Sequence, residues 1–234
     1  MKTIKLSLQE FAQPSPRRGS IEPASGFGTT LQKGIELHQK VQAERKAEYE
    51  EYQSEIPMTW TFERENYRFE VVGRMDGFFA GSKPKIEEIK SSFNIFELAK
   101  VIKDKRFDHP YFLQLISYGY FYWLNHGIKP DLSFFLVSSR RAETYGFDVY
   151  WDLKEVDSWL SRRLDQLVLD AIKAEKRLER RKKLSLNLPF PFPVPRKGQM
   201  ELISFIEEGM VKGKKMLLQA PTGLGKTIGV LYPS

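Results

Sequence analysis

The sequence predicts an α/β fold, in which a small mixed and twisted β-sheet is flanked by helices. Strand-like alternation and helical periodicity occur in turn along most of the chain. A proline-rich stretch then marks a linker, and a glycine-rich loop follows it. We therefore expect four segments: an irregular basic arm (residues 1–27), a main domain (28–184), a Pro-rich linker (185–195) and the start of a second, incomplete domain (196–234).

Composition places the chain among globular proteins and limits its chemistry. Hydrophobic residues make up 41% and aromatic residues 13% of the 234 residues. The lack of cysteine excludes disulfides, thiolate zinc sites and cysteine-bound iron–sulfur clusters. A net charge of +7 permits nucleic-acid binding. No apolar run reaches the roughly 18 residues of a membrane span and no signal peptide follows Met1, so we expect a cytoplasmic protein with no membrane partner.

The amino-terminal part combines an irregular arm with one long helix. Prolines and glycines break up the arm, which has room for one short strand over residues 4–8. A helix is expected from Thr29 to about Tyr52, with a threonine as its amino-terminal cap. Leu31, Ile35 and His38 recur at helical spacing, so we expect His38 on the inward apolar face of this helix.

Asp76 and the run Glu88-Ile89-Lys90 are the centre of the main domain. A turn signal at Ala80–Pro84 separates them. If the chain pairs through this turn, Asp76 lies beside Glu88 and Lys90, which project from the same side of their strand. Two carboxylates and an ammonium group then converge. Oxygen ligands of this kind suit Mg²⁺ or Mn²⁺, and a nearby lysine can steady the water or the phosphate that it attacks.

The other elements of the main domain follow from periodicity and from proline and glycine positions. Strands are expected over residues 58–62, 67–75, 131–138 and 144–150, and helices over residues 93–102, 110–127 and 156–183. Within the second of these helices, Gln114 and Tyr118 lie one turn apart on the same face. The last helix ends in a basic run, for which a solvated face is the first interpretation and phosphate contact the second. Its predicted buried stripe consists of Val156, Leu160, Leu164, Leu167 and Ala171.

Together these residues resemble the PD-(D/E)xK nuclease superfamily, in particular its RecB-like branch with the CRISPR-adaptation nucleases. Asp76 and Glu88-Ile89-Lys90 are similar to the D…ExK core, and Gly73 to Asp76 is similar to its GxxD form. Gly34 to His38 resembles the GxxxH motif, and Gln114 to Tyr118 resembles QxxxY. The resemblance covers residues 34–118 and implies a restriction-endonuclease-like fold.

The resemblance also implies roles for these residues. Lys90 would orient the attacking water or stabilise charge on the phosphate. Gln114 and Tyr118 would position the DNA strand or the network of water and lysine. The chain departs from relatives that carry an iron–sulfur cluster, because it has no cysteine. The implied ligands of one or two Mg²⁺ or Mn²⁺ ions are His38, Asp76, Glu88 and the main-chain carbonyl of Ile89.

The second domain begins with a nucleotide-binding signature. A helix over residues 198–211 and a buried strand over residues 214–219 are expected before the loop Ala220-Pro-Thr-Gly-Leu-Gly-Lys-Thr227. This loop resembles motif I of the superfamily-2 helicases, and Arg196 to Gln199 resembles the upstream glutamine element of their XPD/DinG-like group.

The helicase resemblance implies ATP as a cofactor. Loop amides would cradle the phosphates, the lysine would reach the β and γ groups, and the threonine would hold Mg²⁺. The chain stops seven residues after Thr227, so we expect it to be a piece of a longer protein and to hydrolyse ATP only as part of that protein. The implied ATP-binding residues are Gly223, Gly225, Lys226 and Thr227, with Gln199 on the adenine.

The combined motifs predict a metal-dependent deoxyribonuclease, an exonuclease, that forms the amino-terminal part of a DNA helicase. Its expected partner is single-stranded or flapped DNA, and no sequence feature indicates an oligomeric state. Two alternatives remain open. In the first, the main domain is a non-catalytic DNA-binding module that guides the helicase. In the second, it is an unrelated accessory domain of an ATPase. In the last case His38, Gln114 and Tyr118 do not converge on the carboxylates.

Overall fold

A computed structural model of the chain describes residues 1–14, 31–185 and 189–232. They form two compact units, Met1–Ala174 and Glu175–Ser234. In the first unit the elements before the last helix are β1 (Lys2–Ser7), α1 (Leu8–Phe11), α2 (Leu31–Glu48), β2 (Tyr52–Arg64), β3 (Tyr67–Phe79), β4 (Lys85–Ser92), α3 (Ile95–Lys105), a 3₁₀ turn η1 (Arg106–Asp108), α4 (Pro110–His126), β5 (Asp131–Ser138) and β6 (Thr144–Val149). Helix α5 (Leu153–Ser185) crosses the boundary between the units, and α6 (Gln199–Val211) and α7 (Lys226–Leu231) follow it.

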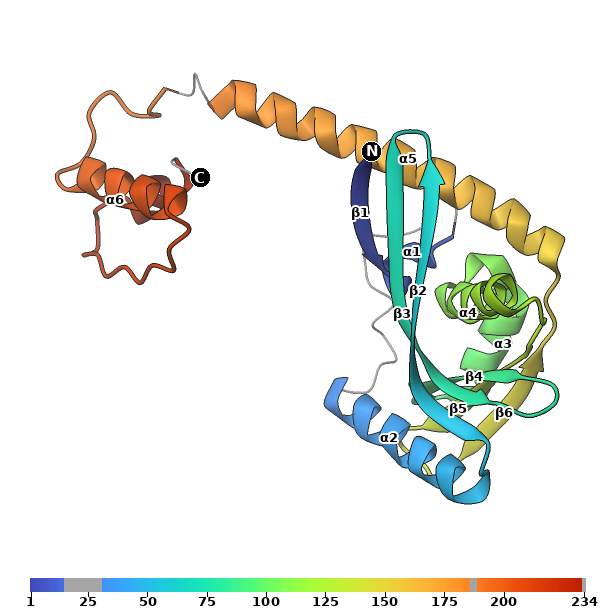
Figure 1. Ribbon diagram of the computed structural model, residues 1–234. Helices are drawn as coiled ribbons and strands as arrows, with labels where there is room; N and C mark the ends of the chain where they lie inside the picture. The colour runs from blue at the N-terminus through green and yellow to red at the C-terminus, as the bar shows by residue number, and fades with distance from the viewer. Residues whose placement is uncertain (15–30, 186–188, 233–234) are drawn as a thin grey trace. The chain divides into compact units, whose positions relative to one another are not determined.

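The first unit is built on a six-stranded mixed sheet, as expected for the main domain. Its order is β1-β3-β4-β5-β6, and β2 pairs with β3 (Figure 1). Strands β2, β3 and β4 are antiparallel neighbours, whereas β1 and β3, and also β4 and β5, run parallel. The parallel step from β4 to β5 is made by the crossover through α3 and α4, since parallel strands need a long connection.

Strand β3 is shared by three neighbours. Strand β2 pairs with one edge of β3 along the whole length of β3. Strands β1 and β4 pair with different parts of the other edge of β3. Strand β1 pairs with Tyr67 to Val72, and β4 pairs with Gly77 to Phe79. Residues 73–76, which include Asp76, therefore lie in an opening where β3 has no strand partner on that edge.

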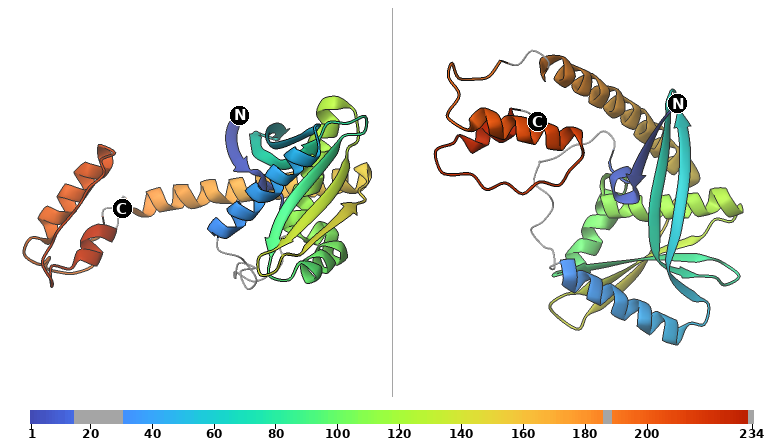
Figure 2. Two further views of the ribbon diagram at one scale, coloured as in Figure 1. Left: turned by 90° about the horizontal axis from the view of Figure 1, so that it is seen from below. Right: turned by 60° about the vertical axis from the view of Figure 1, so that its left-hand side comes forward.

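The sheet lies between two helical layers (Figures 1 and 2). On one face α3, α4 and the first part of α5 bury the main core, and the four larger residues of the predicted α5 stripe are among its buried side chains. On the other face α2 packs through a small cluster of Val41, Ile89 and Val137. Alternation along β4 explains this division, because Ile89 and Glu87 face α2 while Glu88 and Lys90 face the other way.

The short strand expected over residues 4–8 forms as β1, but residues 2–11 are more ordered than the irregular arm expected over residues 1–27. Strand β1 adds to the sheet, and Ser7 caps α1 through a reciprocal capping box with Glu10. Phe11 is fully buried, and Arg163 of α5 donates hydrogen bonds to the main-chain carbonyls of Glu10 and Phe11 at 2.7 and 2.8 Å. Burial of Phe11 makes this segment part of the core. Residues 15–27 of the arm, and the threonine cap expected for the following helix, lie outside the described residues.

Two further predictions about elements need correction. The long helix ends at Glu48, and the following strand begins at Tyr52, earlier than expected, since β2 extends to match the whole length of β3. In the second unit the expected buried strand over residues 214–219 is not formed, and Leu217 is fully exposed. A strand needs a neighbouring strand to satisfy its backbone, and the described part of this unit contains none. No helix among the described residues is both long and apolar enough to cross a bilayer.

Candidate active site

Asp76 lies at the opening of β3, where both its main chain and its side chain are fixed. Its carboxylate Oδ2 accepts a hydrogen bond of 2.9 Å from the main-chain N–H of Ile89 on β4. Its own carbonyl accepts a hydrogen bond of 2.9 Å from the side chain of Gln42. The pairing of β3 with β4 through the turn, as predicted, thus places Asp76 beside the residues of the Glu88-Ile89-Lys90 run.

Glu88 and Lys90 form a buried ion pair on the neighbouring strand. Lys90 Nζ lies 2.5 Å from Glu88 Oε1, and the Glu88 side chain is 0% exposed. Burial, followed by the charge of Asp76, raises the pKa of Glu88 to about 8. Burial acts to lower the pKa of Lys90, but the charges of Glu88 and Asp76 outweigh it, so this pKa is raised and the ammonium form is held. Glu88 Oε2 is buried and has no hydrogen-bond partner among the described residues.

His38 reaches the same place from α2. Its Nδ1 lies 3.9 Å from Asp76 Oδ2. Burial lowers the pKa of His38 although Asp76 opposes this, so the neutral imidazole, the form that binds metals, is favoured. Ile35 was expected on the inward face of α2 together with His38, but Ile35 is 50% exposed, so this prediction is wrong. Helix α2 contacts the sheet through the side chains of Leu37, Val41, Gln42 and Arg45.

Gln114 and Tyr118 are buried on α4, on the side of the sheet that Glu88 faces. The Tyr118 hydroxyl bonds to both main-chain groups of Arg74, and a hydrogen bond from Gln114 also acts on it. Gly73 leaves room for this contact, because a Cβ on it would lie only 3.0 Å from that hydroxyl and 3.0 Å from Leu8 Cβ. The structure thus places both residues beneath β3, next to Asp76, and their contact with DNA stays a prediction.

The convergence of these side chains is evidence against one alternative. An unrelated accessory domain predicted that His38, Gln114 and Tyr118 would lie apart from the carboxylates. Instead, His38 borders Asp76, and the charges of Asp76 and Glu88 both act on the Tyr118 hydroxyl.

Glu55 is a member of the site that the sequence did not indicate. In the pairing of β2 with β3, Ser54 matches Gly77 and Ile56 matches Met75, so Glu55 lies across from Asp76. Its φ of 59° is left-handed, which costs a non-glycine residue about 1–2 kcal/mol. Its charge acts on both His38 and Asp76. A glutamate in a strand carries no signal of such a conformation in the sequence.

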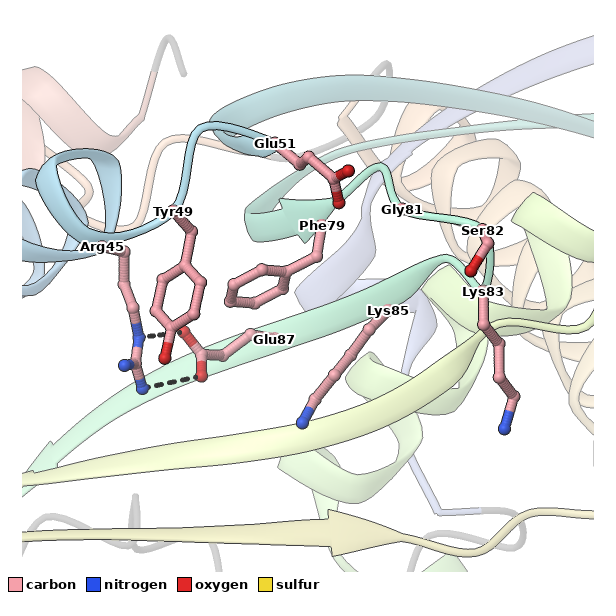
Figure 3. Close-up of a pocket in the computed structure, with 9 residues that line it drawn as sticks. All are labelled: Arg45, Tyr49, Glu51, Phe79, Gly81, Ser82, Lys83, Lys85 and Glu87. Carbon is pink, nitrogen blue, oxygen red and sulfur yellow. Dashed lines mark hydrogen bonds and ion pairs between the residues drawn. The ribbon is translucent and has the colours of Figure 1, made fainter.

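The opposite face of β4 carries a pocket of about 480 Å³ beside the carboxyl end of α2 (Figure 3). In it Arg45 of α2 meets Glu87 with two contacts of 3.2 Å, next to the Tyr49 ring. The Arg45 guanidinium also lies 4.3 Å from the centre of the Phe135 ring. Arg45 therefore fastens the end of α2 to β4, two turns after His38.

In the second unit, the residues predicted to bind ATP lie in one loop and next to it. Gly223 and Gly225 have φ of 84° and 78°, a conformation that favours glycine, and α7 begins at Lys226. Gln199 donates a hydrogen bond of 3.2 Å to the Gly225 carbonyl, so the upstream glutamine contacts the loop. The Lys226 ammonium donates to the carbonyls of two loop residues, Ala220 and Pro221. Thr227 is exposed in the first turn of α7.

The predicted metal ligands are neighbours without forming a complete coordination set. Within the described ranges, no three His, Cys, Asp or Glu side chains are grouped closely enough to hold an ion. The Lys90 ammonium occupies one oxygen of Glu88. The donor types nevertheless fit a hard divalent cation, since Asp76 and the unpartnered Oε2 of Glu88 are carboxylate oxygens and His38 is held neutral.

Comparisons with known proteins give limited likenesses. No family model and no curated protein sequence matches the chain. The crystal structure of SSO0001 aligns at 16% identity with a TM-score of 0.42, over 58% of this chain and 58% of that chain. An alkaline exonuclease from Laribacter hongkongensis aligns at 14% identity with a TM-score of 0.41, over 75% of this chain and 94% of that chain. At these scores the functional argument rests on the site itself.

Proposed function

We propose that the first unit is a divalent-metal-dependent deoxyribonuclease, an exonuclease that hydrolyses phosphodiester bonds in single-stranded or flapped DNA. One observation carries the proposal. Pairing of β3 with β4 sets the Asp76 carboxylate on the main-chain N–H between Glu88 and Lys90, with His38 at 3.9 Å. Carboxylates, an imidazole and an ammonium group in one place are the groups that this hydrolysis needs.

The metal ligands would be Asp76, Glu88 and His38, with the Ile89 carbonyl. The unpartnered Oε2 of Glu88 supports this role, because a buried carboxylate oxygen without a hydrogen bond is otherwise costly. An Mg²⁺ or Mn²⁺ ion bound there supplies charge that polarises the phosphate and makes a water more acidic.

Lys90 would act on the substrate as a fixed cation. The charges of Glu88 and Asp76 keep its pKa raised, so it stays protonated through the neutral range. Its ammonium group is mostly buried, which strengthens its field on a nearby phosphate oxygen. Lys90 therefore would orient the water or stabilise the charge that develops on the phosphate.

We also propose that residues 196–234 begin an ATP-dependent helicase domain. The left-handed Gly223 and Gly225, and the contact of Gln199 with Gly225, support an ATP-binding loop. Fusion to a helicase would deliver single strands or flaps to the nuclease unit. ATP hydrolysis is proposed only for a chain that contains a whole helicase domain.

Cleavage of labelled DNA tests the nuclease proposal. The chain would be incubated with single-stranded, flapped and blunt duplex DNA in Mg²⁺ or Mn²⁺, beside its Asp76→Asn and Lys90→Met variants. We expect metal-dependent cleavage of the first two substrates that both substitutions abolish. A folded chain that binds these DNAs and cuts none would instead identify the non-catalytic guiding module.

A further inference from the structure

Gln42 joins three elements at the candidate site. It lies on α2 one turn after His38 and is only 6% exposed. Its amide Nε2 donates a hydrogen bond of 2.9 Å to the carbonyl of Asp76 on β3 and one of 2.8 Å to Oε1 of Glu55 on β2. Both protons of the amide are thus used, one on each strand.

Glu55 is held for this contact from both sides. While Oε1 accepts from Gln42, Oε2 lies 3.3 Å from Arg74 Nη1. The residue keeps a left-handed backbone, with a φ of 59°, directly across from Asp76. Non-glycine residues persist in this conformation where the surrounding structure holds them, and such positions gather at functional sites.

Apolar packing does little to locate α2 on the sheet. Val41 is the one buried apolar side chain among the described side chains of this helix. Leu37 packs against the same small cluster but is only partly buried. The other inward contacts are polar, with Gln42 bound to β2 and β3 and Arg45 bound to Glu87 of β4. Directional bonds fix the rotation and shift of a helix more closely than a small apolar contact does.

We propose that Gln42 and Glu55 are positioning residues of the metal centre, which clamp α2 against β3 and so set the separation of the His38 imidazole from the Asp76 carboxylate. The inference rests on the proposed nuclease function. Neither residue touches the reacting atoms. Gln42 acts by holding α2, and with it His38 on the same face, against the main chain of Asp76, and Glu55 acts by holding Gln42.

Mn²⁺ affinity of the whole chain, measured by calorimetry or by the electron paramagnetic resonance of free Mn²⁺, tests the clamp. We expect Gln42→Leu and Glu55→Ala to weaken binding roughly 10- to 100-fold, as loss of an orienting partner typically does. Glu55→Gln keeps the oxygen that accepts from Gln42, so it should stay within about 3-fold of the wild type. Glu44→Ala, which removes an exposed carboxylate from the same helix, is the matched control.

A double-mutant cycle separates positioning from general loss of structure. If Gln42 acts through His38, Gln42→Leu should weaken Mn²⁺ binding little further in a His38→Ala background. An additive loss would overturn the clamp. So would Glu55→Gln binding as weakly as Glu55→Ala, because that result would make Glu55 a direct ligand.

The wild type and Asp76→Asn distinguish failure of the clamp from failure of the nuclease proposal. Mn²⁺ binding that Asp76→Asn abolishes but that Gln42→Leu and Glu55→Ala leave unchanged overturns the clamp alone. Mn²⁺ binding that is absent from the wild type, or is equal in Asp76→Asn, overturns the metal centre and the clamp with it. Thermal melting of each variant without metal verifies that it is folded.

Discussion

The hydroxyl of Tyr118 accepts a hydrogen bond of 2.9 Å from the main-chain N–H of Arg74 and donates one of 2.6 Å to the carbonyl of the same residue. Arg74 lies in the opening of β3 between β1 and β4. A side chain of α4 thus replaces the missing strand neighbour, two residues before Asp76. This relation gives a physical reason for a glycine at 73 and a tyrosine at 118, whatever their contact with DNA.

Tyr118→Phe should destabilise the first unit, because it leaves the partly buried N–H and C=O of Arg74 without their partner. We expect a loss of about 1–3 kcal/mol in the free energy of unfolding, measured by urea denaturation. Faster amide hydrogen exchange at Arg74 should accompany it. Tyr111→Phe, at a more exposed tyrosine of the same helix, is the control and should cost little. Equal stability of Tyr118→Phe and the wild type would show that water replaces the hydroxyl.

At pH 9, above the pKa of about 8 of Glu88, Lys90→Met should destabilise the chain because it removes the counter-ion of a fully buried carboxylate. Breaking a buried pair from one side typically costs about 3–5 kcal/mol. The double variant Glu88→Gln/Lys90→Met leaves no unpaired charge and should recover most of that loss in urea denaturation without metal. It should nevertheless cleave no DNA. If the double variant is no more stable than Lys90→Met, the loss comes from packing of the lysine stem and the ion-pair account is wrong.

The sequence predicted the centre of the site because its signals are local. The turn signal at Ala80–Pro84 and alternation along a strand are enough to place Asp76 beside Glu88 and Lys90. Likewise, Pro110 in the first turn and Gly127 with a φ of 70° mark the ends of α4 where they were expected.

What the sequence missed depends on contacts between distant segments. The sequence indicated a short amino-terminal strand, but not helix α1, in which Phe11 enters the core and Arg163 binds the main chain. Gln42 and Glu55 became evident only when α2 was placed on β2 and β3. Conversely, residues 214–219 have the composition of a buried strand, but the described part of the second unit contains no strand to pair with them.

His109 should make stability depend on pH below neutrality. Burial, followed by the charge of Lys105, lowers the pKa of His109 to about 4, from an ordinary value near 6.5. Its Nδ1 also accepts the hydrogen bond from the N–H of Tyr111 that caps α4. The folded state therefore favours the neutral ring. The stability it contributes is complete above pH 6.5 and is lost as the pH falls toward 4.

His109→Asn separates this titration from the cap, because asparagine also caps helices but does not titrate. Urea denaturation at several pH values between 4 and 6.5 should show a shallower decline for this variant than for the wild type. His126→Asn, at the other end of α4, should keep the decline due to His109. Parallel curves for His109→Asn and the wild type would mean that the ring takes up its proton without cost in the folded state.

Glu65→Gly should stabilise the hairpin between β2 and β3. Glu65 follows the pair of Arg64 with Tyr67 and has a φ of 54°, which is strained for a residue with a Cβ. Glycine adopts this conformation freely, so we expect the free energy of unfolding to rise by about 1 kcal/mol. Glu63→Gly, two residues earlier and inside β2, should lower it, because glycine weakens a regular strand. Urea denaturation of both variants measures these changes in the free energy of unfolding. A loss of stability in both variants would show that contacts of the Glu65 side chain outweigh its backbone strain.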